Sequence, residues 1–180
     1  MKTVFYILLV LSISFGCDPM DDVMSEMNPG GEKSTTEEEE EEIELAPFFS
    51  LNNLDGDSVE LDDFENKVLA MYFFGSGCPF CIAAGPDIQK MADQFANNNK
   101  FAIIGLDTWN GNSEAVKAFQ DKAKVKFNLL LSASATAVDY DTRYDRVVIV
   151  NPDGEIVFRG SNRVSNELDD IEDKLKELLD

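Results

Sequence analysis

The sequence predicts an α/β domain with a mixed sheet, and three observations lead to that prediction. Strand-like apolar runs alternate with helical segments through most of the chain, as they do in α/β proteins. Two short hairpins frame this alternation, each marked by a turn that contains Asp and Gly. The chain has 180 residues, 44% of them hydrophobic, which is enough for one ordinary domain plus additional sequence.

The first predicted elements of the domain are a short hairpin, a buried strand and a helix. Residues 48–53 and 58–61 are strand-like and flank the tight turn Asp55-Gly56, which is a hairpin pattern. Residues 67–74 are apolar at consecutive positions, as is typical of a central strand that is covered on both faces. A helix is predicted from Cys81 to Asn97, because apolar residues recur there at helical spacing.

The alternation of strands and helices continues to the end of the chain. Two strands and two helices are predicted in turn at residues 101–107, 113–123, 126–132 and 133–140. A closing hairpin is predicted at residues 146–150 and 155–160, because they flank the turn sequence NPDG, whose glycine can take a positive φ. The last helix, residues 165–179, is predicted to begin at a Ser or Asn cap and to bury one apolar stripe.

The N-terminus has the pattern of a secretion signal. An uncharged apolar run from Val4 to Phe15 follows one Lys, and its twelve residues are fewer than the ~20 that a membrane-spanning helix needs. The sequence SFGC that ends at Cys17 resembles the lipobox of bacterial lipoproteins, although the usual Leu three places before the Cys is missing. We predict a signal peptide at residues 1–16 and lipidation at Cys17. Cleavage by an ordinary signal peptidase, with Cys17 unmodified, is the alternative.

An acidic segment separates this signal from the domain. Residues 17–44 are polar, contain Gly and Pro, and include six consecutive glutamates from Glu37 to Glu42. Such a segment cannot bury enough apolar surface to fold and its charges repel one another, so it is predicted to be a disordered tether. A calcium-collecting or partner-binding role is the alternative. The globular domain is expected at residues 45–180.

The charge of the chain restricts its partners. The formal net charge is -20, and no cluster of Lys and Arg is visible in the sequence. Binding to nucleic acid or to an anionic membrane surface requires such clusters, because the positive side chains neutralise phosphates. We therefore expect no nucleic-acid partner.

Cysteine is the residue type most informative about chemistry. The chain has three cysteines, and lipid on Cys17 would leave the single pair Cys78 and Cys81, two residues apart between a predicted strand and a predicted helix. Such a pair can be a working dithiol, part of a zinc site or a structural disulfide. A structural zinc site needs four ligands, and the chain has no histidine and no third cysteine inside the domain, so no metal site is predicted.

Two stretches of the sequence, residues 47–86 and 147–160, resemble the thioredoxin fold. They are similar to the exported branch shared by the TlpA-type thiol oxidoreductases and the AhpC/TSA redoxins. The resemblance runs from Ala46 to the C-terminus and includes the first hairpin, the strand before CPFC and Pro86, five residues past the second cysteine. It implies a thioredoxin-like three-layer fold, with a mixed central sheet flanked by helices and an extra N-terminal β-hairpin.

The same resemblance implies a function and a setting. It implies a thiol-disulfide oxidoreductase that exchanges a dithiol and a disulfide with protein partners in the bacterial cell envelope. The expected partners are a thiol- or disulfide-containing protein substrate and an upstream electron donor or acceptor, and no bound cofactor is expected. We expect a monomer, attached to the membrane by a lipid anchor and facing the periplasm or the cell surface.

The position of the cysteines predicts their roles. Cys78 should lie at the start of a helix, where unpaired N-H groups and the helix dipole lower the pKa of a thiol below its usual value of about 8.5, so Cys78 is the predicted nucleophile. Cys81, one turn later, is predicted to be more covered and to resolve the mixed disulfide. Pro79 starts the helix readily, and Phe80 could form an apolar lip. A permanent disulfide without redox function is the alternative.

The chain departs from the thioredoxin pattern at two positions that matter for the site. Thioredoxins carry a buried Asp six residues before the first Cys, and Tyr72 stands at that place here. The fold normally has a cis-Pro before the strand of the last hairpin, and that place falls at Asp145. Tyr144, Asp145 and Arg146 are nevertheless predicted to border the site. A solvated surface charge is the alternative for Arg146.

Other functions remain as alternatives at this level. A peroxiredoxin-like thiol peroxidase would place Pro and Thr or Ser at positions that Met71 and Gly75 occupy here. A redox-inert lipoprotein could use the same fold as an interaction module. Trp109, the only tryptophan, is predicted either to flank the site or to cover the end of the core.

Overall fold

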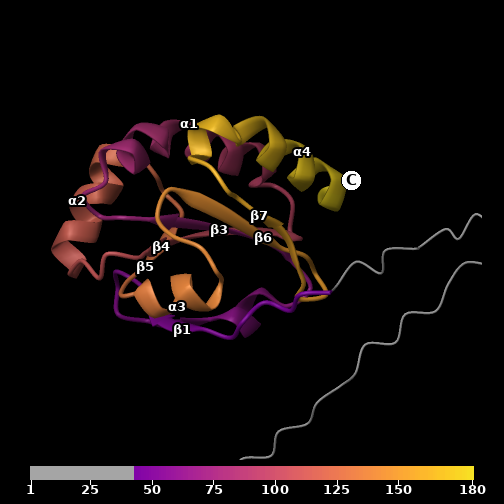
Figure 1. Ribbon diagram of the computed structural model, residues 1–180, viewed down its shortest axis with the longest axis horizontal. Helices are drawn as coiled ribbons and strands as arrows, with labels where there is room; N and C mark the ends of the chain where they lie inside the picture. Colours follow the sequence, from indigo (N-terminus) through magenta and orange to yellow (C-terminus); the bar gives the residue numbers. More distant parts are fainter. Residues whose placement is uncertain (1–42) are drawn as a thin grey trace, which may run out of the picture. The chain divides into compact units, whose positions relative to one another are not determined.

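The computed structural model describes residues 43–180, which contain a central sheet with helices on both faces (Figure 1). The signal peptide predicted at residues 1–16, Cys17 and all but the last two residues of the predicted tether lie outside the described residues. None of the helices in residues 43–180 has the length and apolar character needed to cross a bilayer.

The predicted elements are present, most of them within two residues of their predicted bounds. The strands are β1 (Ser50–Asn52), β2 (Ser58–Glu60), β3 (Val68–Phe74), β4 (Phe101–Asp107), β5 (Asn128–Leu130), β6 (Arg146–Val150) and β7 (Ile156–Arg159). The helices are α1 (Pro79–Phe95), α2 (Ser113–Ala123), α3 (Ser134–Asp139) and α4 (Leu168–Leu179), with 3₁₀ turns at Leu61–Phe64 and Val164–Asn166.

The central sheet is mixed, which confirms the predicted fold class. Its strand order is β5-β4-β3-β6-β7; β3 and β4, and β4 and β5, are parallel, whereas β6 is antiparallel to both β3 and β7. The register pairs Phe74 with Asp107 and Phe73 with Arg146. The carboxyl ends of β3 and β4 therefore meet the beginning of β6 at one edge of the sheet, where α1 also begins.

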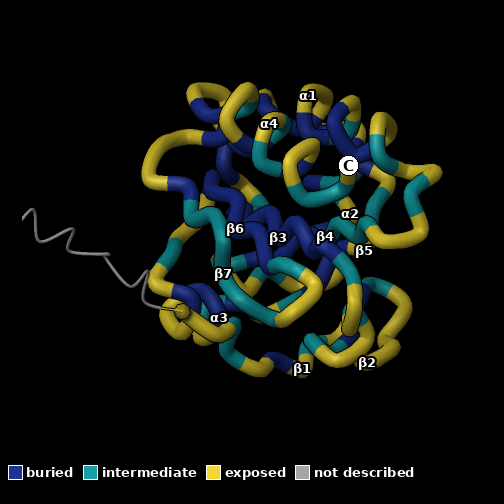
Figure 2. The backbone as a smooth tube through the Cα atoms, turned by 90° about the vertical axis from the view of Figure 1, so that its right-hand side faces the viewer, coloured by how far each residue is buried: buried dark blue, intermediate teal, exposed yellow. Residues whose placement is uncertain are grey.

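Helices and the small hairpin cover the two faces of the sheet (Figures 1 and 2). One buried cluster joins the sheet to α1, α2 and α4, and the other joins it to α3 and the β1-β2 hairpin. All seven residues of β3 are buried: Tyr72 and Phe74 belong to the α1 cluster, whereas Met71 and Phe73 belong to the α3 cluster. Two-sided burial explains why β3 is apolar at consecutive positions.

The described chain begins along the outer edge of β7. The amide of Ala46 donates to the carbonyl oxygen of Gly154 at 2.8 Å, and the amide of Ile156 donates to the carbonyl oxygen of Glu44 at 2.8 Å.

The glycines of the two predicted turns, Gly56 and Gly154, have φ values of 91° and 83°, as the turn types require.

The start of the last helix differs from the prediction. α4 begins at Leu168, its N-cap residue is Glu167, and no side chain caps it, so the predicted Ser or Asn cap is wrong. Val164–Asn166 forms a 3₁₀ turn instead. The carboxylate of Glu167 accepts hydrogen bonds from the amides of Ser161 and Asn162, at 3.1 and 2.9 Å, and so fixes the preceding loop.

Candidate active site

Cys78 and Cys81 form a disulfide at the point where β3 leads into α1. Their Cα atoms are 5.3 Å apart, and Cys78 is the N-cap residue of the 17-residue helix α1. Pro79 occupies the first helical position, where it loses no hydrogen bond because the amides of the first turn have no partner inside the helix. The Sγ atom of Cys78 accepts a hydrogen bond from the amide of Cys81 at 3.1 Å. The first turn of α1 thus directs a backbone donor at this sulfur.

The disulfide is buried, and an exposed aromatic side chain stands between its two cysteines. Cys78 is 1% exposed and Cys81 is 0% exposed, so the expected difference in their accessibility is small in the disulfide form. Phe80, between them, is 51% exposed, and the Arg163 guanidinium lies over its ring at 3.5 Å from the centroid. This stacking holds Phe80 at the surface beside the disulfide.

A carboxylate that the sequence analysis did not single out organises the loop before Cys78. Asp107, the last residue of β4, is fully buried, and its Oδ1 atom accepts a hydrogen bond from the amide of Ser76 at 2.9 Å. The same carboxylate accepts from the amides of Trp109 and Gly111. Asp107 therefore joins the loop that precedes the disulfide to the loop after β4. The signal in the sequence was an acid at the end of an otherwise apolar strand.

Trp109 lies against the loop that carries the disulfide. A Cβ atom added to Gly75 would overlap the indole ring of Trp109, so only glycine fits at this position without a shift. Trp109 also packs edge-on against Tyr144, with 5.2 Å between the ring centroids, and the two side chains are 48% and 41% exposed. Trp109 and Tyr144 thus form an exposed aromatic pair beside the loop before Cys78.

Asp145 immediately precedes β6, at the place where the thioredoxin resemblance implies a cis-Pro. No peptide bond in residues 43–180 is cis, and Asp145 takes a left-handed conformation with φ of 63°. Its amide donates to the carbonyl oxygen of Phe73 at 2.7 Å. Its side chain is buried, and Oδ1 has no hydrogen-bond partner among the described residues. Burial raises the pKa of this carboxyl, an effect that Arg146, the amide of Val164 and Arg163 oppose.

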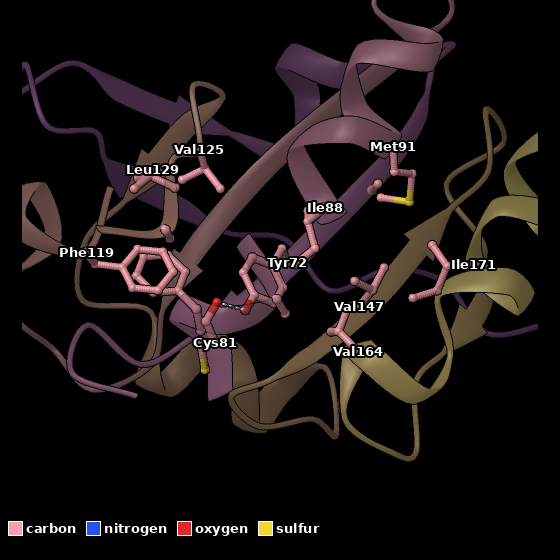
Figure 3. Packing of buried hydrophobic residues seen from close by; sticks show 14 of the residues in the cluster. Tyr72, Cys81, Ile88, Met91, Phe119, Val125, Leu129, Val147, Val164 and Ile171 are labelled. Atoms are coloured by element: carbon pink, nitrogen blue, oxygen red, sulfur yellow. Dashed lines mark hydrogen bonds between the residues drawn. The ribbon is translucent and has the colours of Figure 1, made fainter. Parts of the chain in front are cut away.

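Tyr72 connects the centre of the sheet to the second cysteine. Its hydroxyl donates to the carbonyl oxygen of Cys81 at 3.2 Å, and the bond is buried (Figure 3). Burial raises the pKa of Tyr72 far above its usual value, and the charge of Asp145 raises it further. Tyr72 is therefore a neutral hydrogen-bond donor, and Asp145 lies close enough to act on it electrostatically.

The burial of Arg146 decides against one of the two interpretations considered for it. It is 7% exposed, so its interpretation as a solvated surface charge is wrong. Its guanidinium donates to the carbonyl oxygen of Asp145 at 2.7 Å, and burial lowers its pKa. Its side chain lines a pocket together with Arg143 and Arg159. Its backbone pairs with Phe73 near the end of β3, the strand that leads to the disulfide.

Comparisons with known proteins agree with this arrangement. The model of the AhpC/TSA family matches residues 44–159. The thioredoxin-like protein YneN of Bacillus subtilis is 25% identical over 117 residues, which are 64% of this chain and 69% of YneN. The thiol-disulfide oxidoreductase ResA of Halalkalibacterium halodurans is 28% identical over 116 residues, which are 63% of this chain and 65% of ResA. The match thus spans about two thirds of each of these curated relatives.

A solved structure extends the likeness from sequence to geometry. The thioredoxin domain of a thiol-disulfide oxidoreductase from Bacteroides vulgatus superposes with a TM-score of 0.65 at 25% sequence identity. The superposition covers 76% of this chain and 96% of that domain. The family match covers more than half of the chain and includes the C-x-x-C pair. This chain belongs to the AhpC/TSA family, among its thioredoxin-fold thiol-disulfide oxidoreductases.

Proposed function

We propose that this protein exchanges a dithiol and a disulfide with protein partners in the bacterial cell envelope, with Cys78 as the nucleophile and Cys81 as the resolving residue. The observation that carries the proposal is the hydrogen bond of 3.1 Å from the amide of Cys81 to the sulfur of Cys78. A donor in that place, together with the positive end of the α1 dipole, stabilises a thiolate on Cys78 more than a thiol.

The exchange proceeds through a mixed disulfide. A partner thiolate attacks Sγ of Cys78, the bond between Cys78 and Cys81 breaks, and its electron pair leaves on Cys81, which takes up a proton. A second partner thiol loses its proton and attacks the partner sulfur that is bound to Cys78, so the Cys78 thiolate departs. The partner has then lost two electrons and the Cys78/Cys81 pair has gained them. The reverse sequence reduces a partner disulfide, and neither direction needs a bound cofactor.

The surroundings of the disulfide support a protein partner. Phe80, Trp109 and Tyr144 each expose between 41% and 51% of their surface near the start of α1. Aromatic side chains that are partly exposed around a reactive bond supply apolar contact area to a docked polypeptide. In this proposal Pro79, Phe80, Tyr144, Asp145 and Arg146 border the site.

The setting of the exchange follows from the N-terminal sequence. We assign residues 1–16 to a signal peptide, Cys17 to lipid attachment, residues 17–44 to a tether and residues 45–180 to the catalytic domain. Lipid attachment would keep a monomer at the membrane, facing the periplasm or the cell surface, where an upstream donor or acceptor resets the pair. Metabolic labelling with a fatty acid tests this assignment, because Cys17→Ser should abolish the label.

Trapping of the mixed disulfide tests the catalytic roles. In the mature chain with Cys17→Ser, the additional change Cys81→Ser leaves Cys78 without its resolving partner. When this variant attacks a disulfide of insulin, the mixed disulfide should persist and be detected on a non-reducing gel. The matched variant Cys78→Ser should trap none and should lose insulin-reducing activity. Equal trapping by both variants would overturn the assignment of Cys78 as the nucleophile. Insulin-reducing activity of Cys78→Ser equal to that of the unsubstituted pair would overturn the enzymatic role of Cys78 and Cys81.

A peroxide assay separates this function from that of a thiol peroxidase. The place where a peroxidase carries Thr or Ser is Gly75, which is packed beneath Trp109 and has no hydroxyl to hold a peroxide. We expect hydrogen peroxide to oxidise the Cys78 thiolate no faster than it oxidises the thiolate form of free cysteine. A sulfenic acid that forms on Cys78 much faster than on a free cysteine thiolate would instead assign a peroxidase.

A further inference from the structure

Three of the four arginines in this acidic chain line one surface pocket. The chain has a formal net charge of -20, and its four arginines all lie between residues 143 and 163. Arg143, Arg146 and Arg159 line a pocket with a volume of about 370 Å³, which is within the range of small-molecule sites. We call this the arginine pocket; its other lining residues are Asp141, Thr142, Gly160 and Ser161. The lining is polar throughout, so the pocket suits a polar ligand.

The arginine pocket lies on the face of the sheet that α3 covers. Arg146 pairs with Phe73 and Arg159 pairs with Val148, and both of these apolar partners belong to the cluster that joins the sheet to α3. Directly paired residues of antiparallel strands place their side chains on the same face of a sheet. The cysteines of the disulfide belong to the other cluster, on the face covered by α1. The pocket is therefore distinct from the redox site.

One guanidinium of the arginine pocket already binds a carboxylate. The Arg159 guanidinium donates two hydrogen bonds to the carboxylate of Glu44, at 2.9 and 2.6 Å. This contact lowers the pKa of Glu44 and raises that of Arg159. Two parallel N-H donors facing two carboxylate oxygens are the geometry with which arginine recognises carboxylates. Arg159 therefore shows which chemical group suits the pocket.

Arg146 is the buried charge of the pocket. It is 7% exposed, and the one hydrogen bond of its side chain is donated to the carbonyl oxygen of Asp145 at 2.7 Å. A guanidinium has five N-H donors, so most of those of Arg146 remain available. Within residues 43–180, neither Arg146 nor Arg143 forms a salt bridge. Since buried charges in proteins are normally paired, a buried guanidinium that lines a pocket indicates an anionic ligand.

Arg143 adds positive charge beside Arg146. Burial lowers the pKa of Arg146, and the charge of Arg143 lowers it further. The two guanidinium groups are therefore close enough to repel each other. An anion in contact with both would replace this repulsion with attraction.

The acidic side chains around Arg146 do not neutralise it by contact. The groups whose charges raise its pKa are Asp145, Glu167 and Tyr144. Neither of the two carboxylates forms a salt bridge with Arg146 in the described part of the chain. The Oδ1 atom of Asp145 and the Oε2 atom of Glu167 have no hydrogen-bond partner there either. Asp141 lines the pocket, and its charge acts on Arg159.

We propose that the arginine pocket binds a small organic acid through a carboxylate group that Arg143 and Arg146 share. The bound carboxylate accepts hydrogen bonds from both guanidinium groups and separates two charges that otherwise repel. The volume of the pocket leaves room for the rest of a small molecule, and its polar lining favours a second polar group, such as another carboxylate. This binding is independent of the redox function proposed above.

The small number of arginines makes binding easy to follow. In the mature chain with Cys17→Ser, labelled with ¹⁵N-arginine, the Nε-Hε region of an NMR spectrum contains one signal per arginine. At constant ionic strength, the dicarboxylate succinate should shift the signals of Arg143 and Arg146 along one common saturation curve. The signal of Arg163, which does not line the pocket, should stay in place. Succinamide, the uncharged analogue of succinate, should shift none of the four signals.

Arg143→Gln is the variant that tests the shared contact. Arg143 is exposed, so its replacement should leave the fold intact. The half-saturation concentration of succinate, followed on the Arg146 signal, should rise by roughly tenfold or more, because a charge-assisted hydrogen bond is lost. Lys90→Gln is the matched control, since it removes one positive charge from an exposed position on α1 and should leave the half-saturation concentration unchanged.

Three results would overturn the proposal. The first is a failure of succinate to shift the Arg146 signal, or equal shifts by succinate and succinamide. The second is an unchanged half-saturation concentration in Arg143→Gln. The third comes from inorganic phosphate, which should shift the same signals only at higher concentrations than succinate does. If phosphate acts at lower concentrations, the pocket selects phosphate groups and the assignment to a carboxylate is wrong.

Discussion

The hydroxyl of Tyr72 donates a hydrogen bond to the carbonyl oxygen of Cys81 at 3.2 Å, and this bond ties the central strand to the first turn of α1 (Figure 3). A second buried tyrosine makes a similar bond on the opposite face of the sheet, where the hydroxyl of Tyr140 donates to the carbonyl oxygen of Pro47 at 2.7 Å. Both phenols are kept neutral, because burial raises their pKa values. Tyr72 therefore fixes the first turn of α1 to β3, whereas Tyr140, at the end of α3, fixes the segment before β1 to that helix.

The change Tyr72→Phe removes only the first of these bonds. We expect the free energy of unfolding to fall by about 1 kcal/mol, the usual net contribution of a buried neutral hydrogen bond. Amide exchange in the first turn of α1 should become faster, because the carbonyl of Cys81 loses its tie to β3. Urea denaturation and hydrogen exchange of the disulfide form measure the two effects.

Tyr140→Phe is the matched control for this prediction. It removes the bond to Pro47 and should lower stability by a similar amount, about 1 kcal/mol, on the face covered by α3. Amide exchange in α1 should stay as it is in the wild type, apart from the change in global stability. Equal acceleration in α1 by both variants would show that Tyr72 has no specific effect on the disulfide segment.

Asp145 should make the stability of the protein depend on pH. Burial raises the pKa of its carboxyl from the usual value of 3.8, so between that value and the raised pKa the folded state binds more protons than the unfolded state. The contribution of Asp145 to stability is therefore most favourable below its usual pKa. That contribution falls as the pH rises through the raised pKa, and the destabilisation is complete above it.

Asp145→Asn isolates this effect, because asparagine tolerates the left-handed backbone with φ of 63°. We expect the variant to be more stable than the wild type at neutral pH, by on the order of 1 kcal/mol, since it removes a buried charge with an unsatisfied oxygen. The difference should vanish as the pH falls below the usual pKa of aspartate. Urea denaturation across this pH range provides the measurement, and a difference that is independent of pH would contradict the explanation.

The sequence predicted the sheet, the helices and the cysteine pair because each depends on local patterns. The consecutive apolar residues of β3 and the NPDG turn before β7 are read from neighbours in the chain. The last helix was predicted to begin several residues before its true start. The Glu167 carboxylate accepts a hydrogen bond from the amide of Ser161, and the spacing of apolar residues does not reveal this contact. Patterns within a few residues are sufficient for elements but not for their caps.

The surroundings of the disulfide were less predictable, because they depend on register between distant strands. Asp107 reaches the amide of Ser76 only because Phe74 pairs with Asp107 across β3 and β4. The burial of Arg146 likewise follows from its pairing with Phe73. Asp145 was located correctly before β6, but its unsatisfied oxygen could be recognised only from the packing.

Asp107→Ala should loosen the loop that precedes Cys78. The change removes the acceptor for the amides of Ser76, Trp109 and Gly111. We expect a loss of about 2–3 kcal/mol in the free energy of unfolding, because buried donors are left without partners. The fluorescence of Trp109, the only tryptophan, should shift to longer wavelength in the folded variant as its loop becomes more hydrated.

Asp87→Ala is the control for the loss of a charge from this acidic chain. Asp87 is exposed on α1, and its removal should change stability by no more than about 0.5 kcal/mol and leave the fluorescence unchanged. Asp107→Asn keeps one acceptor oxygen and should fall between Asp107→Ala and the wild type. A folded Asp107→Ala protein with the stability and spectrum of the wild type would contradict the anchoring role.

The packing of Trp109 on the loop before the disulfide predicts a pair of coupled substitutions. A Cβ atom at Gly75 would overlap the indole of Trp109, so Gly75→Ala should lower the free energy of unfolding by about 1–3 kcal/mol. Trp109→Ala removes the obstacle, so the double variant should lose less stability than the sum of the two single changes. The interaction energy from a double-mutant cycle should be at least about 0.5 kcal/mol.

Gly77→Ala is the matched control for this prediction. Its Cβ would meet the same ring at 3.4 Å, an ordinary contact, so this variant should show neither the loss of stability nor the coupling. Additive losses for Gly75→Ala and Trp109→Ala would mean that the indole does not determine the choice of glycine beside the disulfide.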